Sequence, residues 1–194
     1  MFSDEIDPGD APEPPSIHAP PAGLRIAVYG DPHALPGLRP GALDRLEQKL
    51  TAAAQALGGL AGELSLAVVD DPAMADLHQR YKGEPGPTDV LTFDLRDDPA
   101  APVDPGAIEG EVVVCWPEAE RQTAADPAHA GRDPEHELLL YALHGLLHLL
   151  GQDDLTPEGF ARMHQIEDRV LAQIGVGAVF NPSAVADQIG GAQA

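Results

Sequence analysis

Two histidines lie four residues apart in a leucine-rich stretch, and this pairing is the strongest chemical signal in the sequence. His144 and His148 stand among leucines that run from Leu138 to Leu150. A spacing of four places both imidazoles on the same face of a helix. Because buried imidazoles need polar partners, one divalent metal ion bound by both rings would satisfy them. The pair therefore predicts a metal site, whereas the plain alternative is two ordinary histidines at the rim of a helical core.

A glycine and a carboxylate follow the pair at positions that favour the metal interpretation. Gly151 allows the chain to leave the helix in a left-handed turn, and Asp154 comes three residues later. A helix with two histidines, a glycine turn and a third ligand is also the layout of metzincin zinc sites. We therefore predict that His144, His148 and Asp154 are metal ligands.

Three further residues bear on the type of enzyme and on the choice of the third ligand. Gly145 stands directly after the first histidine, where metzincin proteases carry the glutamate that acts as general base, so we do not expect a peptidase. Asp153 competes for the place of third ligand, but its one-residue shift should turn its side chain away. His164 is a second competitor, although we expect a solvated surface histidine there.

Charge and composition exclude several classes of protein. The 194 residues include 32 acidic and 11 basic ones, for a net charge of −21, whereas a DNA-binding protein that works by bulk charge needs clustered Lys and Arg. The single cysteine, Cys115, excludes an internal disulfide, and we expect an inert core thiol. No apolar stretch reaches the roughly 20 residues that span a bilayer. The acidic first residues do not resemble a secretory signal. We expect a cytoplasmic protein that binds neither membranes nor DNA.

Strand and helix patterns alternate along the chain and predict an α+β fold. Apolar and β-branched runs indicate about four strands, at 24–29, 63–69, 89–95 and 111–115. Helical spacing with start and stop residues indicates helices at 40–57, 71–81, 117–125, 133–150 and 156–174. Asp71 is the expected N-cap of the second helix. We expect one mixed sheet packed with helices, with the leucine-rich helix buried at the centre.

The two ends of the chain differ in composition from its middle. Residues 1–22 contain six prolines, five acidic residues and no Lys or Arg, so we expect a disordered acidic tail. Residues 175–194 are rich in Gly and Ala, and we expect a flexible C-terminal tail that is poorly ordered or loosely docked. The predicted folded domain is therefore residues 23–174.

Three segments of this domain resemble the YbeY-type endoribonucleases, also called rRNA maturation factors. Residues 144–154 read His-Gly-Leu-Leu-His-Leu-Leu-Gly-Gln-Asp-Asp and fit ten of the eleven positions of the family pattern His-Gly-x-Leu-His-Leu-x-Gly-x-Asp-His. Residues 87–93, Pro-Thr-Asp-Val-Leu-Thr-Phe, are similar to the family's Pro-Thr-Asp-Val-Leu-Ser-Phe stretch. Residues 110–114, Gly-Glu-Val-Val-Val, resemble its Gly-Asp-Ile strand. The three motifs occur in the family's order across the folded domain.

The resemblance implies roles for residues that spacing alone does not assign. Asp154 takes the place of the family's third histidine, and a carboxylate also ligates zinc. Lys82 takes the place of a family arginine that is expected to contact phosphate, and Arg80 lies close by in the sequence. The resemblance therefore implies Lys82 and Arg80 as catalytic residues. Thr88 and Asp89 either line the cleft or only form a hydrogen-bonding pair at the start of a strand.

The implied function is that of a zinc-dependent endoribonuclease with one bound ion. The resemblance implies cleavage of single-stranded RNA in small-subunit rRNA 3′-end maturation and in ribosome quality control. Its implied partners are rRNA, the small ribosomal subunit and ribosomal proteins. Two alternatives remain at this point: a non-catalytic ribosome-assembly factor whose metal is structural, and a metal-dependent hydrolase of a small substrate.

Overall fold

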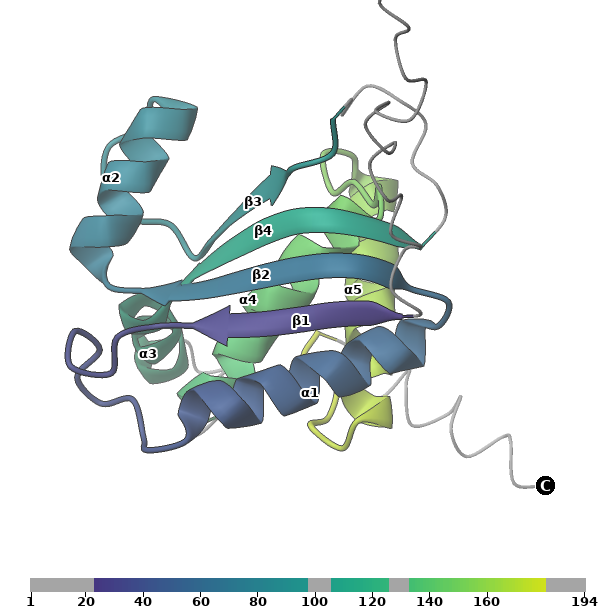
Figure 1. Ribbon diagram of the computed structural model, residues 1–194, viewed down its shortest axis with the longest axis horizontal. Helices are drawn as coiled ribbons and strands as arrows, with labels where there is room; N and C mark the ends of the chain where they lie inside the picture. Colours follow the sequence, from purple (N-terminus) through teal and green to yellow (C-terminus); the bar gives the residue numbers. More distant parts are fainter. Residues whose placement is uncertain (1–22, 98–105, 126–132, 181–194) are drawn as a thin grey trace, which may run out of the picture.

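Four strands form one mixed sheet in the part of the chain that the computed structural model describes, residues 23–97, 106–125 and 133–180. The strand order is β1-β2-β4-β3 (Figure 1). The bounds are β1 (Leu24–Tyr29), β2 (Ala61–Val69), β3 (Val90–Asp94) and β4 (Ala107–Cys115). β1, β2 and β4 run parallel, whereas β3 pairs antiparallel with β4 at the edge of the sheet. The predicted α+β fold with a four-stranded mixed sheet is confirmed.

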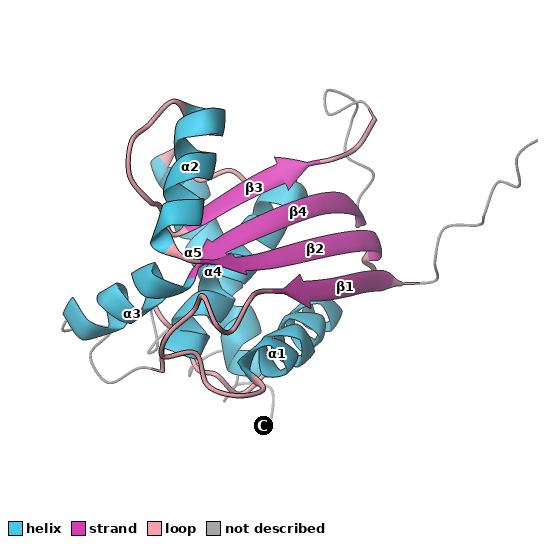
Figure 2. Cartoon of the chain, turned by 60° about the vertical axis from the view of Figure 1, so that its left-hand side comes forward, coloured by secondary structure: helices cyan, strands magenta, loops and turns pink. Residues whose placement is uncertain are grey.

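Helices cover the two faces of the sheet unequally. Those in the described residues are α1 (Ala42–Leu57), α2 (Asp71–Lys82), α3 (Trp116–Ala125), α4 (Pro134–Leu149) and α5 (Pro157–Gln173). α1, α4 and α5 lie on one side of the sheet, and α2 stands on the other side, where the parallel strands end (Figures 1 and 2). None of the described helices is both long and apolar enough to cross a membrane.

The start of α2 differs from the prediction by one residue. The N-cap is Asp70, whose Oδ1 accepts a hydrogen bond from the Ala73 N–H at 3.0 Å. Asp71, the predicted cap, is the first helical residue, and its Oδ2 accepts a hydrogen bond from Arg121 at 2.7 Å. Both aspartates precede the same proline, so the sequence alone does not separate the cap from its neighbour.

Alternation along the strands divides the apolar residues between two clusters. Leu64, Leu66 and Val68 of β2 face the side of α1 and α4 and join the main core. On the opposite side, Cys115 of β4 is fully buried in a smaller cluster with Met74 of α2. Period-two alternation accounts for both clusters, because successive side chains of a strand point to opposite faces.

Helix α4 runs through the centre of the main core, as its all-round leucine pattern predicts. Asp133 caps its start, and the carboxylate of Glu135 is held by Arg39, which precedes α1, and by Arg45 of α1. Arg39 Nε and Arg45 Nη2 each donate to Glu135 Oε1 at 2.7 Å. These hydrogen bonds, first that of Arg45, hold the pKa of Glu135 below its usual range. The first turn of α4 is therefore fixed to the segment that carries α1.

A glycine lets α4 approach the sheet closely at the point where the histidines lie. A Cβ atom on Gly145 would stand 2.7 Å from Val112 Cγ1 and 2.9 Å from Thr92 Oγ1. Such distances are well inside van der Waals contact, so a larger residue would push α4 off the strands. The glutamate of a metzincin peptidase does not fit at this position, which gives a steric reason for the glycine.

The chain that follows α5 folds back onto the domain. Asp168 Oδ1 accepts hydrogen bonds from the N–H groups of Val179 at 2.6 Å and Phe180 at 2.8 Å. Val176 and Val179 pack against the main core. Residues 175–180, the first part of the predicted C-terminal tail, are therefore docked on the domain. The remainder of that predicted tail, and the predicted tail at 1–22, lie outside the described residues.

Candidate metal centre

The two histidines of α4 point their Nε2 atoms at each other. His144 Nδ1 lies 2.8 Å from Glu167 Oε1, and His148 Nδ1 lies 3.1 Å from the carbonyl oxygen of Gln152. A carbonyl and a carboxylate oxygen accept hydrogen bonds, so both Nδ1 atoms are the protonated donors. In two neutral rings the Nε2 atoms then carry lone pairs, and these atoms are 3.0 Å apart. Two facing lone pairs at this distance repel each other unless a proton or a cation lies between them.

Asp154 completes a group of three possible ligands. Its Oδ2 lies 3.6 Å from His144 Nε2, and its Oδ1 lies 3.9 Å from His148 Nε2. One ligand atom from each of the three residues lies within 4.8 Å of the others. Zinc bonds of about 2.0–2.2 Å in tetrahedral geometry place ligand atoms about 3.3–3.6 Å apart. The observed separations lie on both sides of that value, so the three residues fit a zinc-sized ion.

The turn after α4 brings Asp154 back to the histidines and turns its neighbour away. Gly151 has a positive φ of 77°, which reverses the chain directly after the helix. Asp153 Oδ1 accepts a hydrogen bond from the Leu155 N–H at 2.8 Å and is thus used in the turn itself. The structure brings Asp154 to the histidine pair, in agreement with the prediction, and leaves Asp153 outside the group.

His164, the other competitor, has a different environment from the one predicted. Its ring stacks on Phe180, with centroids 3.6 Å apart, and packs at a tilt against Phe160. Only 20% of its side chain is exposed, so the prediction of a solvated surface histidine is wrong. His164 is not part of the three-ligand group found among the described residues.

Sequence reasoning missed Glu167, the carboxylate that orients His144. Its side chain is completely buried on α5. Burial alone would lower the pKa of His144, but the hydrogen bond and charge of Glu167, with the charges of Asp154 and Asp89, raise it overall. A metal-binding histidine usually donates its other ring N–H to such an acceptor, which fixes the ring and makes it a stronger ligand.

The spacing along α5 carries a signal that could have identified Glu167. Met163, Glu167, Val170 and Leu171 follow the spacing of one buried helix face. A charged residue in that series must find a partner, because an unpaired buried charge is very costly. The series indicates that Glu167 has a buried role, but it does not reveal which residue is the partner.

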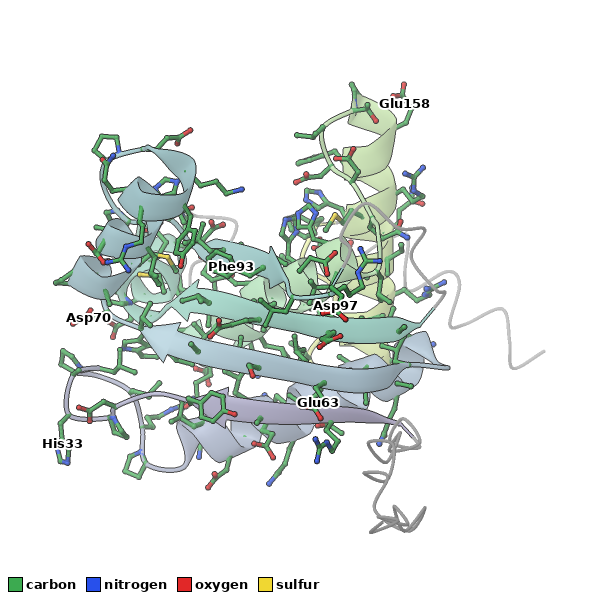
Figure 3. All side chains as sticks on the ribbon, turned by 45° about the horizontal axis from the view of Figure 1, so that its top comes forward. His33, Glu63, Asp70, Phe93, Asp97 and Glu158 are labelled. Atoms are coloured by element: carbon green, nitrogen blue, oxygen red, sulfur yellow. The ribbon has the colours of Figure 1, made fainter. Side chains whose placement is uncertain are left out.

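A cleft of about 570 Å³ opens over the three candidate ligands. Its wall includes residues of strand β3 and of the end of α2. In Figure 3, α2 stands on one side of β3, and the first turn of α5, marked by Glu158, stands on the other side. The cleft is lined by Lys82, Asp89, Val90, Leu91, Thr92, Asp94, His144, His148, Leu149 and Asp154. A site built across several elements in this way leaves the ligand side of the histidines accessible to a substrate.

The two predicted catalytic cations occupy different positions. Lys82 is among the residues that line the cleft. Arg80 is not, and its Nη2 donates to Asp76 Oδ2 at 2.8 Å on the exposed face of α2. The structure therefore brings Lys82 to the same cleft as the histidine pair and does not bring Arg80 there.

Asp89 both lines the cleft and takes part in a local hydrogen-bonding pair. Its Oδ1 accepts from Thr88 Oγ1 at 2.9 Å and from the Val90 N–H at 2.8 Å. These two bonds fix the carboxylate at the cleft wall. Asp89 therefore lines the cleft and also forms the hydrogen-bonding pair at the start of the strand, whereas Thr88 is not among the lining residues.

The cleft contains more negatively charged than positively charged side chains. Lys82 shares the cleft with three carboxylates, those of Asp89, Asp94 and Asp154. Asp94 is paired with Arg96, whose hydrogen bonds hold the pKa of Asp94 below its usual range. A divalent cation at the histidine pair would offset the excess negative charge and make the cleft suitable for an anionic substrate.

Comparisons with known proteins agree with this geometry. A family model described as "Endoribonuclease YbeY" matches residues 40–175, which include the three candidate ligands, Lys82 and Glu167. A relative with that name from Beutenbergia cavernae is 46% identical over 115 residues, which is 56% of this chain and 72% of the relative. One from Frankia alni is 44% identical over 117 residues, 57% of this chain and 62% of the relative.

A more distant likeness exists among solved structures. The solution structure of a protein from Thermotoga maritima is 25% identical, covers 77% of this chain and 91% of its own, and has a TM-score of 0.49. The family assignment depends instead on the sequence match, which extends over well more than half of the chain. The chain belongs to the YbeY endoribonuclease family.

Proposed function

We propose that this protein is a metal-dependent endoribonuclease that cuts single-stranded RNA during maturation of the small-subunit rRNA. One observation carries the proposal: His144, His148 and Asp154 direct ligand atoms to one point inside a cleft that Lys82 also lines. Three protein ligands with an open position are characteristic of catalytic zinc sites, whereas structural sites are usually closed by four. Membership of an endoribonuclease family supplies the reaction type.

The donor set supports zinc as the resident ion. Two imidazole nitrogens and one carboxylate oxygen form a borderline set that suits zinc better than the all-oxygen sets of magnesium or calcium. When bound, zinc supplies Lewis-acid stabilisation of phosphate charge and lowers the pKa of a water molecule. The protein's part is to hold His144 and His148 in the tautomer that offers Nε2, through Glu167 and the Gln152 carbonyl.

Lys82 is proposed to bind the phosphate that is cleaved. It is the cation among the lining residues of the cleft, and an ammonium group stabilises the charge that develops on a phosphate oxygen. The surrounding carboxylates repel anions from the rest of the cleft, so an anionic phosphate is attracted only to the point where the metal and Lys82 act together.

The negative charge of the whole chain bears on how RNA reaches this cleft. A net charge of −21 opposes nonspecific association with nucleic acid. We therefore propose that rRNA within the small ribosomal subunit is the substrate, presented with the help of a basic ribosomal protein. We also propose that the enzyme is cytoplasmic, in keeping with this partner, and that residues 23–174 contain the endoribonuclease domain.

A cleavage assay on single-stranded RNA tests the reaction. The zinc-loaded protein is expected to cut the RNA, His144→Ala to abolish cleavage, and Lys82→Ala to reduce it by roughly 10²–10³-fold, as for loss of one charge-stabilising group. Lys82→Arg should retain activity. Arg25→Ala, which removes a surface cation paired with Glu63 on the sheet, is the control. Cleavage that survives His144→Ala would contradict the proposal. Zinc binding without cleavage would favour a non-catalytic assembly factor, and cleavage of small phosphodiesters alone would favour a small-substrate hydrolase.

Metal retention tests the ligand assignment separately from the reaction. After dialysis, Asp154→Ala should lose most of its zinc, whereas Asp154→His should retain it because an imidazole also ligates zinc. Asp153→Ala is the matched control, since its carboxylate is engaged by the Leu155 N–H. If Asp154→Ala keeps stoichiometric zinc, or if Asp153→Ala or His164→Ala releases it, the assignment is wrong.

A further inference from the structure

A second cavity, of about 280 Å³, adjoins the candidate metal centre. It shares Asp89, Val90 and His144 with the metal cleft, so the two spaces meet at the first histidine. The remaining described residues of its wall are Gln122, Glu137, Leu140, Tyr141, His164, Glu167 and Phe180. A substrate that places a phosphate at the metal therefore has room for an adjoining group in this second space.

One wall of the cavity is aromatic and is held in place by the docked C-terminal segment. Phe180 and His164 stack with an interplanar angle of 1° and centroids 3.6 Å apart. Asp168, which is buried, fixes this arrangement because its Oδ1 accepts the Phe180 N–H. His164 covers one face of the Phe180 ring, and 40% of Phe180 is still exposed. Phe180 also lines the cavity, so the exposed part of its ring is available for contact with another flat ring.

Two polar atoms in the wall are buried and make no hydrogen bond of normal geometry to the described residues. They are Oε2 of Glu167 and the hydroxyl of Tyr141, and the hydroxyl interacts with the Glu137 carboxylate. Tyr141 is 6% exposed and Glu167 is completely buried. Leaving such groups unpaired is destabilising, and native proteins keep few of them. A ligand that fills the cavity and hydrogen bonds to these atoms would remove that penalty.

The state of the Tyr141 hydroxyl makes it a suitable partner for a neutral ligand. Burial, together with the nearby Glu137 carboxylate, raises the pKa of Tyr141 far above its usual range, so the hydroxyl stays protonated. Its proton can be directed at the Glu137 carboxylate, which leaves the hydroxyl oxygen, like the neighbouring carboxylates, as an acceptor for a ligand. The cavity therefore offers mainly hydrogen-bond acceptors, and its ligand should carry N–H donors.

We propose that this cavity binds one nucleobase of the RNA, next to the phosphate at the metal, and that it prefers bases with an exocyclic amino group. The inference rests on the proposed endoribonuclease function and adds a base preference to it. Single-stranded RNA is recognised by stacking of splayed bases on aromatic side chains and by hydrogen bonds to base edges. The Phe180 ring supplies the stacking face, and Tyr141 with Glu167 supplies the acceptors. Adenine, cytosine and guanine carry an amino group, whereas uracil does not.

Binding of free nucleosides tests the cavity without using activity as the readout. Zinc-loaded full-length protein is titrated with adenosine, cytidine or uridine, and NMR shifts of the Tyr141, His164 and Phe180 rings are followed. Adenosine and cytidine are expected to bind at least about fivefold more tightly than uridine, as for one good hydrogen-bonded base contact. Uridine binding as tight as that of adenosine and cytidine, or ring signals that do not move, would overturn the proposal.

Two substitutions locate the binding within the cavity. Tyr141→Phe should reduce the difference in affinity between adenosine and uridine. Phe180→Ala should lower the affinity for all three nucleosides by about fivefold or more, as for loss of a stacking ring. Tyr29→Phe and Tyr29→Ala are matched controls on an exposed residue of β1. Thermal unfolding of Tyr141→Phe should stay near that of the wild type, because the hydroxyl makes no hydrogen bond of normal geometry to the described residues.

Cleavage of short RNAs that differ at one base separates this proposal from the proposed function. Wild-type protein should prefer A or C over U at one position beside the cut, and Tyr141→Phe should lose that preference while it still cleaves. If RNA is cut and Tyr141→Phe keeps the wild-type preference, the cavity proposal fails and the endoribonuclease proposal stands. If nucleosides bind as expected and no RNA is cut, the endoribonuclease proposal fails instead.

Discussion

Replacing Glu167 by glutamine should weaken zinc binding without unfolding the protein. Glu167 Oε1 accepts the His144 Nδ1 proton at 2.8 Å and lies in a fully buried position, so the interaction is a charged hydrogen bond screened from water. The glutamine can still accept a hydrogen bond, but it lacks the charge that makes His144 a stronger ligand. Loss of such an orienting partner typically lowers metal affinity by about 10–100-fold, which is roughly 1.4–2.7 kcal/mol.

Competition with a chromophoric chelator measures this affinity directly. Glu158→Gln is the matched control, because Glu158 lies on the exposed first turn of the same helix (Figure 3). It removes the same charge from α5 at a site that does not contact the histidines. We expect zinc affinity to fall for Glu167→Gln and to stay at the wild-type value for Glu158→Gln.

Thermal unfolding of the metal-free proteins distinguishes ligand orientation from support of the fold. One oxygen of Glu167 has no hydrogen-bond partner among the described residues, so burial of its charge is only partly compensated. Glutamine loses the charge interaction with His144 but removes a buried charge, and the two effects oppose each other. We therefore expect a midpoint within about 3 °C of the wild type. Wild-type zinc affinity together with a large drop in midpoint would refute the orienting role.

Further predictions concern other parts of the chain. Gly145→Ala should destabilise the protein by about 1–3 kcal/mol in denaturant unfolding, because the added methyl group overlaps β3 and β4; a fully stable variant would contradict the close approach. Burial raises the pKa of Cys115 to about 12, so its reaction with a thiol reagent at pH 8 should be roughly three orders of magnitude slower than after denaturation; equal rates would show that the thiol is accessible. Glu135→Gln should lower the thermal midpoint at pH 7 by roughly 2–6 °C. Hydrogen bonds, first that of Arg45, lower the folded-state pKa of Glu135. The stability that ionised Glu135 contributes is therefore present above the ordinary glutamate pKa and disappears as the pH falls through the lowered pKa. A difference in midpoint between wild type and Glu135→Gln that persists at still lower pH would show that the charge of Glu135 is not its cause. Deletion of residues 1–22 should move the midpoint by less than about 2 °C, and a larger drop would show that this segment packs on the domain.

The closeness of the three candidate ligands is predictable from the sequence because their spacing is local. His144 and His148 share one face of a single helix, and Gly151 limits how far Asp154 can lie from them. No tertiary knowledge is needed to bring these residues together. The same locality explains why the strands and helices were predicted closely, since hydrophobic periodicity and caps act over a few residues.

Other features of the site depend on packing between distant segments, which the sequence pattern does not specify. Glu167 reaches His144 only because α5 packs against α4, and His164 is shielded only because Phe180 folds back over it. Local chemistry was also ambiguous at Asp70 and Asp71, where two adjacent aspartates are equally able to cap a helix. Arg80 and Lys82 are two residues apart, and the difference in their positions follows from which side of α2 faces the cleft.

A zinc titration with RNA cleavage as the readout tests the central claim most directly. Protein stripped by a chelator should be inactive on single-stranded RNA, and cleavage should rise in proportion to added zinc until one equivalent is bound per chain. This result is expected because His144, His148 and Asp154 form one three-ligand group with an accessible side. Full cleavage by the stripped protein, or cleavage that does not respond to the first equivalent of zinc, would contradict the account.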